Sequence, residues 1–184
     1  KSLSDRVGPD RVVWRYDPLI LDPRRGLDED RHRRNFERLA TGLAGYCNTL
    51  IVSVIDPYRK TRRRLGDAAD GVIYDSNAYR DLAAWIAGRA GEAGLQVQSC
   101  AEEDMNVPGI RPGACVDADR LARISGRAAP RAPHRQRPGC LCRRSVDIGV
   151  NNTCGFGCLY CYATSDHQAA QATLARHDPC APSL

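Results

Sequence analysis

The sequence lacks any long run of apolar residues and is almost without lysine. No apolar stretch approaches the roughly 18 residues that a membrane-spanning helix needs, so we expect no membrane contact. The opening segment, KSLSDRVGPDR, has no apolar region of the kind that secretion signals carry. Lys1 and Lys60 are the only lysines among the 27 basic residues, and all the others are arginine. These absences favour a soluble, cytoplasmic protein.

The net charge of +5 does not by itself indicate a nucleic-acid-binding protein. The arginines of segment 31–38 stand among the acidic residues of segment 28–37, so their charge is largely balanced locally, as on a solvated helix face. Residues 126–139, GRAAPRAPHRQRPG, form a proline- and arginine-rich connector without periodicity. This connector is the only independent support for a nucleic-acid partner.

Strand-like and helix-like patterns alternate along the chain. Short apolar, β-branched or aromatic runs predict strands at residues 12–16, 50–55, 95–99 and 145–149. Amphipathic spacing predicts helices over residues 30–44, 76–93 and 167–176, and a short helix capped by Asp117, while the arginine-rich residues 58–75 are predicted as a loop. Such alternation predicts an α/β fold with a parallel sheet. Because an eight-stranded barrel needs about 250 residues, four βα units predict a partial (β/α) TIM-like barrel.

The length and the first residue of the chain bear on how much of the fold is present. The chain has 184 residues, enough for one sizeable core, and it begins with Lys1 rather than methionine. We therefore expect that a segment before Lys1 is missing. The predicted division is a partial barrel over residues 1–125, a connector over 126–144 and a metal-binding βα unit over 145–184.

The nine cysteines indicate metal binding rather than a disulfide framework. Their number is odd, the chain is larger than disulfide miniproteins, and five of them lie between Cys140 and Cys161. The tightest group, Cys154, Cys158 and Cys161, has the spacing Cys-x3-Cys-x2-Cys, with Gly155 and Gly157 available for tight turns. Thiolates suit both zinc and iron–sulfur clusters. Three thiolates would leave one iron of a four-iron cluster open, whereas structural zinc normally takes four ligands.

This spacing, with Tyr160 before the last cysteine, resembles the signature of the radical S-adenosylmethionine superfamily. The resemblance implies a 4Fe–4S cluster on Cys154, Cys158 and Cys161 and an S-adenosylmethionine molecule on the open iron. It also implies a 5′-deoxyadenosyl radical, an unidentified, small-molecule substrate and an electron donor such as flavodoxin or ferredoxin. In that superfamily the cysteine loop follows the first strand. Its C-terminal position here implies a permuted barrel whose last βα unit takes that part.

Over most of its length the chain resembles the C-terminal portion of an uncharacterised bacterial family, a domain of unknown function with a C-terminal radical-SAM-like cysteine cluster. Two positions depart from the family pattern, Asn151 in place of an aromatic residue and Phe156 in place of histidine. The matching stretches are residues 13–18, 53–56 with Tyr58 and Lys60, 100–102, 136–137, 140–142, 147–149, the cysteine loop and 177–179.

Charged residues at the ends of predicted strands are candidates for holding the cofactor or the substrate. Arg15, Asp56 and Glu102, with Asp17 and Ser53 as neighbours, lie at or just past the carboxyl ends of strands, where α/β folds build active sites. With Tyr160, we expect them to contact S-adenosylmethionine or the substrate. The alternative is that each is paired structurally with a neighbour.

Four more cysteines, Cys100, Cys115, Cys140 and Cys142, are candidates for an auxiliary iron–sulfur cluster or a zinc ion. The alternative is that they are scattered free thiols. Cys47 and Cys180 are expected to be bystanders, and His134 and His177 surface residues.

Three functions remain open from the sequence. The first is a radical S-adenosylmethionine enzyme of unidentified reaction. The second is a non-catalytic zinc or iron–sulfur module. The third is a nucleic-acid repair enzyme, because a similar cysteine loop occurs in the spore photoproduct lyase group.

Overall fold

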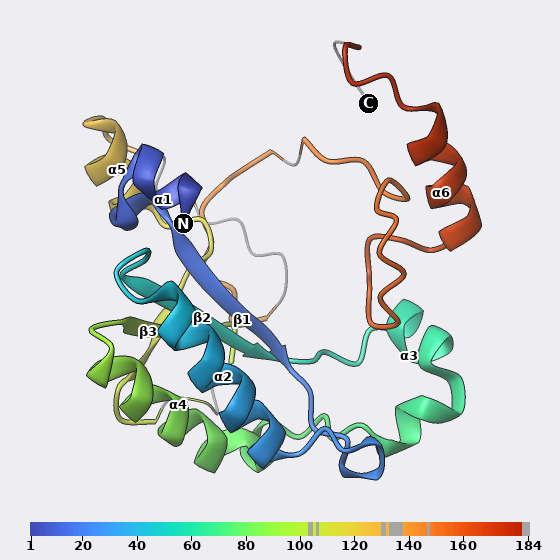
Figure 1. Cartoon of the computed structure of the whole chain (residues 1–184), viewed down its shortest axis with the longest axis horizontal. Helices are drawn as coiled ribbons and strands as arrows, with labels where there is room; N and C mark the ends of the chain where they lie inside the picture. The colour runs from blue at the N-terminus through green and yellow to red at the C-terminus, as the bar shows by residue number, and fades with distance from the viewer. Residues whose placement is uncertain (103–104, 106, 130–131, 133–137, 147, 182–184) are drawn as a thin grey trace. The chain divides into compact units, whose positions relative to one another are not determined.

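The computed structural model describes residues 1–102, 105, 107–129, 132, 138–146 and 148–181 (Figure 1). They form two compact units. Unit 1 consists of residues 1–55 and 72–145, and unit 2 of residues 56–71 and 146–184. None of the helices in these described residues is long and apolar enough to cross a membrane.

Unit 1 holds the strands and most of the helices. Its strands are β1 (Val13–Leu19), β2 (Thr49–Val54), β3 (Gln96–Cys100) and β4 (Ile110–Gly113), and its helices are α1 (Ser2–Val7), α2 (Glu29–Leu43), α4 (Arg80–Glu92) and α5 (Ala118–Ser125). Unit 2 contains α3 (Arg59–Leu65) and α6 (His167–Arg176). Short 3-10 turns lie at Pro9–Arg11, Pro23–Arg25, Gly66–Gly71 and Ser76–Tyr79.

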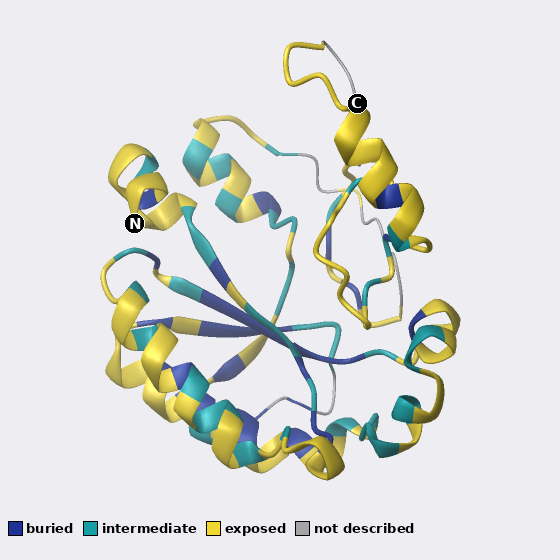
Figure 2. Cartoon of the chain, turned by 45° about the vertical axis from the view of Figure 1, so that its right-hand side comes forward, coloured by how far each residue is buried: buried dark blue, intermediate teal, exposed yellow. Residues whose placement is uncertain are grey.

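The four strands form one parallel sheet in the order β1-β2-β3-β4. In register, Trp14 lies beside Leu50, and Leu50 beside Val97. These apolar side chains join Phe36 of α2 and Ile86 of α4 in the hydrophobic core, and the Trp14 and Phe36 rings stack at 5.0 Å. Figure 2 shows buried residues on the strands and on the helices beside them. Helices α2 and α4, which follow β1 and precede β3 in the chain, therefore cover one face of the sheet.

The opposite face of the sheet is polar. Alternate residues of a strand point to opposite faces, so Arg15, paired with Ile51, shares a face with Gln98. The next residues on that face are Ser53 and Cys100. Ser53 and Gln98 are buried there. This partly buried polar face, opposite the apolar one, brings several of the predicted site residues together in unit 1.

Most predicted elements are confirmed. The strands at 12–16, 50–55 and 95–99 correspond to β1, β2 and β3, although β1 continues through Asp17 and Pro18 instead of ending there. Helix α6 has the predicted bounds, and Asp117 caps α5 by accepting from the N–H groups of Asp119 and Arg120. The apolar stripe of the helix predicted over 76–93 is fully buried: Tyr79 in the 3-10 turn, and Leu82, Ala83, Ile86 and Ala90 in α4.

Two predictions about the fold are wrong. Residues 145–149 form no strand at their described positions, where Val146 and Ile148 are exposed and lack a sheet to join. The fourth strand of the sheet is β4, which the sequence patterns did not predict because Pro112 and Gly113 are poor strand formers. Residues 59–65, predicted as loop, form α3, since arginine and leucine favour helix. The predicted α/β fold with a parallel sheet is confirmed; the sheet of the described residues is open, and the partial barrel stays a prediction.

Unit 2 has almost no hydrophobic core. Its buried described residues are Thr61, Thr164 and Ala170. Large apolar side chains instead lie exposed around the cysteine loop. They are Val146, Ile148, Val150, Phe156, Leu159, Tyr160, Tyr162 and Leu174.

Candidate functional site

The three cysteines of the predicted cluster lie on one loop of unit 2 that leads into α6. Cys154 and Cys158 are exposed and Cys161 is partly buried. Gly157 has a φ of +72°, a backbone conformation that a side chain would strain. A Cβ added at Gly155 would approach Leu174 Cδ2 of α6 to 3.2 Å, so this glycine lets the loop lie close to the helix. Both glycines therefore serve the tight path of the loop.

Arg64 of α3 holds this loop by its backbone. The guanidinium donates hydrogen bonds to the carbonyl oxygens of Cys158 at 3.2 Å and Cys161 at 3.3 Å, and to that of Thr164. The hydroxyl of Thr61, on the same helix, donates to the carbonyl of Tyr160 at 3.5 Å. Helix α3 thus fixes the segment between the second and third cysteines.

A second set of hydrogen bonds closes the loop at its base. The Asn152 side-chain oxygen accepts from the backbone N–H of Ser165 at 2.7 Å and from its hydroxyl at 3.1 Å. Asp166 then caps α6 by accepting from the N–H groups of Gln168 and Ala169. The loop is therefore tied at both ends to the start of the helix.

The local environment favours the thiolate form of Cys161. Burial, the largest single influence, raises the pKa of this thiol, but hydrogen bonds from Thr164 and Ala163 and the charge of Arg64 lower it overall. The backbone N–H of Thr164 donates to the Cys161 sulfur at 3.3 Å. A thiolate is the form of cysteine that binds metal.

As the side chains lie, no three His, Cys, Asp or Glu groups in the described part of the chain are arranged to hold a single metal ion. This applies to the cysteine loop and to the four other candidate cysteines alike.

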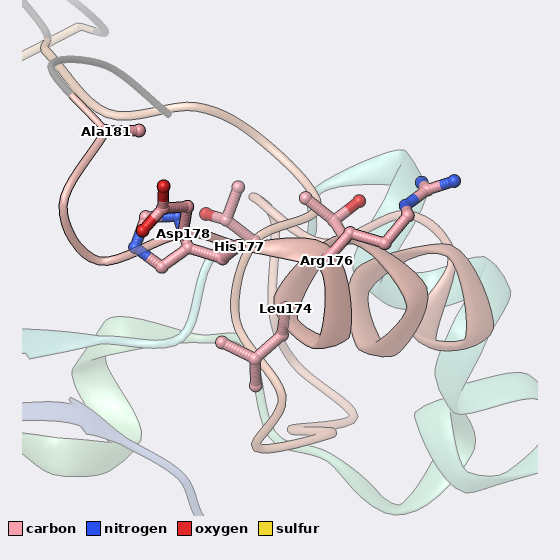
Figure 3. Close-up of a pocket in the computed structure, with 7 residues that line it drawn as sticks. Leu174, Arg176, His177, Asp178 and Ala181 are labelled. Carbon is pink, nitrogen blue, oxygen red and sulfur yellow. The ribbon is translucent and has the colours of Figure 1, made fainter.

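A cavity of about 330 Å³ lies next to the loop, between Thr153 and the end of α6. Figure 3 shows Leu174, Arg176 and His177 at the end of the helix, with Asp178 and Ala181 on the segment that follows. The wall of the cavity is largely apolar with a few charged groups. Thr153, the residue before Cys154, is one of the residues that line it. His177 lines this cavity and is exposed.

In unit 1, Arg15 and Asp17 form an ion pair on the polar face of the sheet. The Arg15 Nε lies 3.2 Å from Asp17 Oδ1, and a second guanidinium nitrogen bonds the other carboxylate oxygen. This hydrogen bond is the main cause of the raised pKa of Arg15. Ser53 donates to Asp17 at 3.2 Å. The structure thus brings together three of the predicted strand-end residues.

Gln98 adds an unpaired polar atom to this face. Its side chain is 4% exposed, and its Oε1 atom has no hydrogen-bond partner among the described residues. Buried oxygens of this kind are normally paired, so this acceptor is available to a donor that enters the face. Sequence patterns do not identify this atom, because glutamine in a strand is usually exposed.

The remaining predicted cofactor residues belong to both units, Glu102 to unit 1 and Asp56 and Tyr160 to unit 2. Glu102 accepts a hydrogen bond from the backbone N–H of Val54 at 3.2 Å, which ties the segment after β3 to β2. Asp56 is partly buried at the start of unit 2. Tyr160 is 42% exposed on the cysteine loop. None of these positions tests a role in binding a cofactor.

Cys100, Cys115, Cys140 and Cys142 are not scattered. The sulfurs of Cys100 and Cys115 lie 3.3 Å apart, and Arg15 donates to the Cys115 sulfur at 2.5 Å. Cys142 has side-chain hydrogen bonds with both Cys115 and Cys140. The four thiols therefore form a continuous row.

Contacts within this row shift the acidity of its thiols in opposite directions. The hydrogen bond with Cys100, followed by that from Arg15, lowers the pKa of Cys115 to about 5. The same hydrogen bond, together with burial, raises the pKa of Cys100. Burial raises the pKa of Cys142.

Cys47 lies outside this row, in the hydrophobic core, as expected of a cysteine without a site role. Burial raises its pKa as well. Cys180 is exposed.

Sequence analysis missed Arg64 as a site residue. It stands in the run Arg62-Arg63-Arg64, where no local pattern separates it from its neighbours. Its partners are 94 to 100 residues further along the chain. No signal in one sequence identifies such a contact.

Comparison with known proteins assigns the chain to a family. No curated protein and no solved structure matches it. One family model, that of the domain of unknown function DUF1848, matches residues 1–163, which span both the sheet and the cysteine loop. This chain belongs to the DUF1848 family.

Proposed function

We propose that the loop Cys154–Cys161 binds a 4Fe–4S cluster and that the protein is an enzyme of the radical S-adenosylmethionine type. When bound, such a cluster supplies the electron for reductive cleavage of S-adenosylmethionine. The observation that carries the proposal is the anchored loop: three soft thiol ligands within eight residues, held by Arg64 from a separate helix.

The donor set suits a cluster better than a single ion. Each thiolate of a cluster binds a different iron, so the three sulfurs stand farther apart than the ligands of one ion. Cys154 and Cys158 are exposed, so their sulfurs are accessible, and the N–H donated to Cys161 stabilises its charge. Three protein ligands leave a fourth iron open to a small molecule.

The lack of a core in unit 2 also supports a bound metal centre. A segment of this size with three buried residues, none of them large and apolar, buries too little surface to be stable by itself. Small metal-binding segments obtain their folding free energy from the metal. Binding at the three cysteines would supply what the exposed apolar side chains do not.

The sheet of unit 1 supports a partial (β/α) barrel. Its strand order increases in one direction, and the connecting helices α2 and α4 pack on the apolar face. Doubly wound folds reverse the order and place helices on both faces, whereas barrels enclose the other face. Arg15, Asp17 and Gln98 would then face the interior, where they could bind and orient the substrate.

The cavity beside Cys154 is the place we assign to part of the small-molecule ligand. It adjoins the loop, and Arg176 and His177 on its wall can donate hydrogen bonds to a carboxylate. The side chains of this chain would thus bind and orient the ligand.

Anaerobic reconstitution with ferrous iron and sulfide tests the proposal. We expect about four iron atoms per chain and production of 5′-deoxyadenosine from S-adenosylmethionine with dithionite. The variants Cys154→Ala, Cys158→Ala and Cys161→Ala should each lose both, while Cys180→Ala, an exposed cysteine outside the loop, should keep them.

The outcomes separate the two main functions. A stable cluster without 5′-deoxyadenosine would favour the non-catalytic iron–sulfur module, and stoichiometric zinc at these cysteines would favour the zinc module. If the protein carries neither metal after reconstitution, the proposal is wrong.

A polyanionic substrate is a second candidate function, as in a nucleic-acid repair enzyme. The supporting observation is helix α3, which exposes Arg59, Lys60, Arg62 and Arg63 in the same unit as the cysteine loop. These four side chains could bind phosphates while Arg64 holds the loop. The connector 126–139, the other basic segment, lies partly outside the described residues.

Salt dependence tests this candidate. Binding to single- or double-stranded DNA should weaken steeply as the salt concentration rises. Replacing Arg59, Lys60 and Arg63 with glutamine should reduce the slope of log affinity against log salt by the amount expected for about three phosphate contacts. Binding that is unaffected by the substitutions would exclude α3 as the nucleic-acid surface.

A further inference from the structure

We propose that Cys100, Cys115, Cys140 and Cys142 form a second metal site, separate from the cysteine loop, that binds one tetrahedral zinc ion. The site lies at the carboxyl edge of the sheet in unit 1, where β3 ends and the chain leaves β4. It does not depend on the cluster proposed for unit 2.

Three segments that are distant in sequence supply the ligands. Cys100 is the last residue of β3, Cys115 follows β4 by two residues, and Cys140 and Cys142 come after the connector. Strands β3 and β4 are adjacent and parallel, with Cys100 paired to Gly113, so their carboxyl ends meet. This explains the proximity of the first two thiols.

Backbone contacts hold the third segment against the first two. The N–H of Arg143 donates to the carbonyl of Val116 at 3.0 Å. Gly139, with a φ of +71°, lies so close to Ala101 that an added Cβ would meet its carbonyl oxygen at 3.4 Å. Cys140 and Cys142 are therefore fixed between residues that adjoin Cys115 and Cys100, and both are buried.

The spacing of the sulfurs favours a single ion over a cluster. The Cys100 and Cys115 sulfurs are 3.3 Å apart. Two thiolates on one tetrahedral zinc, each about 2.3 Å from the metal, stand about 3.8 Å apart. Ligands on separate irons of a four-iron cluster lie farther apart than this. The sulfurs of the observed pair need to move apart only slightly to bind zinc. Four thiolates then complete a closed structural site.

Zinc binding would require the four sulfurs to move from a row to the corners of a tetrahedron around the ion. As the side chains lie, each sulfur contacts its neighbour, and no three described ligands surround a common point. Rotation about the Cα–Cβ bonds moves the sulfurs without moving the backbone. Binding would release the thiol protons to solvent, since the thiolate is the ligand.

Charge and hydrogen bonding fit a thiolate site. Four thiolates around Zn²⁺ carry a net charge of about −2, and the Arg15 guanidinium already lies 2.5 Å from the Cys115 sulfur. The Cys142 sulfur accepts hydrogen bonds from the backbone of Val116 and Cys115. Such second contacts orient ligands and spread the charge of the site.

Metal analysis of a full-length variant without the cysteine loop tests the proposal. In C154S/C158S/C161S we expect about one zinc per chain, and about one Co²⁺ that gives the thiolate-to-metal absorption of a tetrahedral site. In that background, Cys115→Ser and Cys142→Ser should each weaken Co²⁺ binding at least about tenfold. Cys180→Ser, an exposed cysteine outside both sites, is the matched control.

Folding is checked by fluorescence of Trp14 and Trp85, which both lie in unit 1. If Cys142→Ser unfolds unit 1, the exposed Cys115→Ser decides the question. Absence of zinc together with absence of Co²⁺–thiolate absorption would overturn the proposal. So would an iron–sulfur chromophore in the loop variant, a Cys100–Cys115 disulfide in place of metal, or binding unaffected by both substitutions.

Discussion

At the scale of single residues, Arg64 is the side chain on which the cysteine loop depends. Its guanidinium donates to three backbone carbonyls of the loop, and no neighbouring hydrogen bond can replace all three. A planar guanidinium can serve several acceptors at once, whereas a lysine ammonium is a compact point charge. The contribution of Arg64 is therefore geometric as well as electrostatic.

We predict that Arg64→Ala lowers the affinity of the loop for the reconstituted cluster about tenfold, because a loss of about 1.4 kcal/mol is expected from hydrogen bonds to a charged donor. Arg64→Lys should fall between this variant and the wild type. The measurement is iron content against added iron and sulfide. The control is Arg63→Ala, an exposed neighbour on the same helix. Equal losses in both variants would contradict a specific role for Arg64.

Tyr79 is one of the buried residues whose ionisation lowers stability at alkaline pH. Its buried hydroxyl accepts from the N–H of Leu21 at 2.9 Å and donates to the carbonyl of Ile73 at 2.6 Å. Burial raises the pKa of this phenol from 10.0 to about 12. The neutral form is therefore favoured in the folded state.

We predict that unit 1 loses about 2–3 kcal/mol of stability between about pH 10 and pH 12 because of this group. The stabilisation is complete below the unfolded-state pKa and declines as pH rises toward the folded-state value. Urea unfolding followed by tryptophan fluorescence measures it. Tyr79→Phe should be less stable at neutral pH by about 1–3 kcal/mol and should show a smaller alkaline decline than the wild type. An identical decline in the variant would assign it to other groups.

At the scale of elements, the helices of unit 1 are held by a narrow stripe of contacts. Phe36 of α2 is fully buried and lies between Trp14 and Trp85, with ring centroids 5.0 and 5.9 Å away. Leu39, three residues along the same helix, is 38% exposed. Periodicity placed both in the apolar stripe, but the sheet covers only part of it.

Phe36→Ala should therefore lower the free energy of unfolding of unit 1 by about 3–5 kcal/mol, because it leaves a cavity among aromatic rings. Leu39→Ala on the same helix should cost less than about 1 kcal/mol. Urea denaturation with tryptophan fluorescence compares the two. Similar losses would mean that α2 packs through a wider face than the structure indicates.

At the scale of the whole molecule, the two units differ in what stabilises them. Unit 1 has a continuous core on one face of its sheet. Unit 2 relies on hydrogen bonds between α3, the loop and the start of α6, with large apolar side chains left in solvent. Burial of apolar side chains therefore stabilises the first unit far more than the second.

On the basis of the proposed cluster, we predict that metal-free protein is cleaved by chymotrypsin at Phe156, Tyr160 or Tyr162, and that the loaded protein is cleaved there about tenfold more slowly. Mass spectrometry of the fragments locates the cuts. Fragments from unit 1 are the internal control, because their release should not depend on iron. Equal cleavage of loaded and metal-free protein would show that the loop is not ordered by metal.

The sequence by itself determined the local features of this protein. Helix periodicity, the Asp117 cap and the apolar runs of β1, β2 and β3 follow from interactions between near neighbours, so one chain segment was enough to predict each. The spacing of the cysteine loop is local in the same sense. The same reasoning failed for β4, because pairing with β3 outweighed the weak strand propensity of Pro112 and Gly113.

Only the tertiary structure decided which distant side chains meet. Arg64 contacts a loop about 100 residues further along the chain, and the row of thiols joins Cys100 to Cys142. Only the folded path of the chain brings these positions together. The polar face around Arg15 and Gln98 likewise depends on strand register. Such contacts carry no signature in a single sequence, because their free energy arises between segments and not within them.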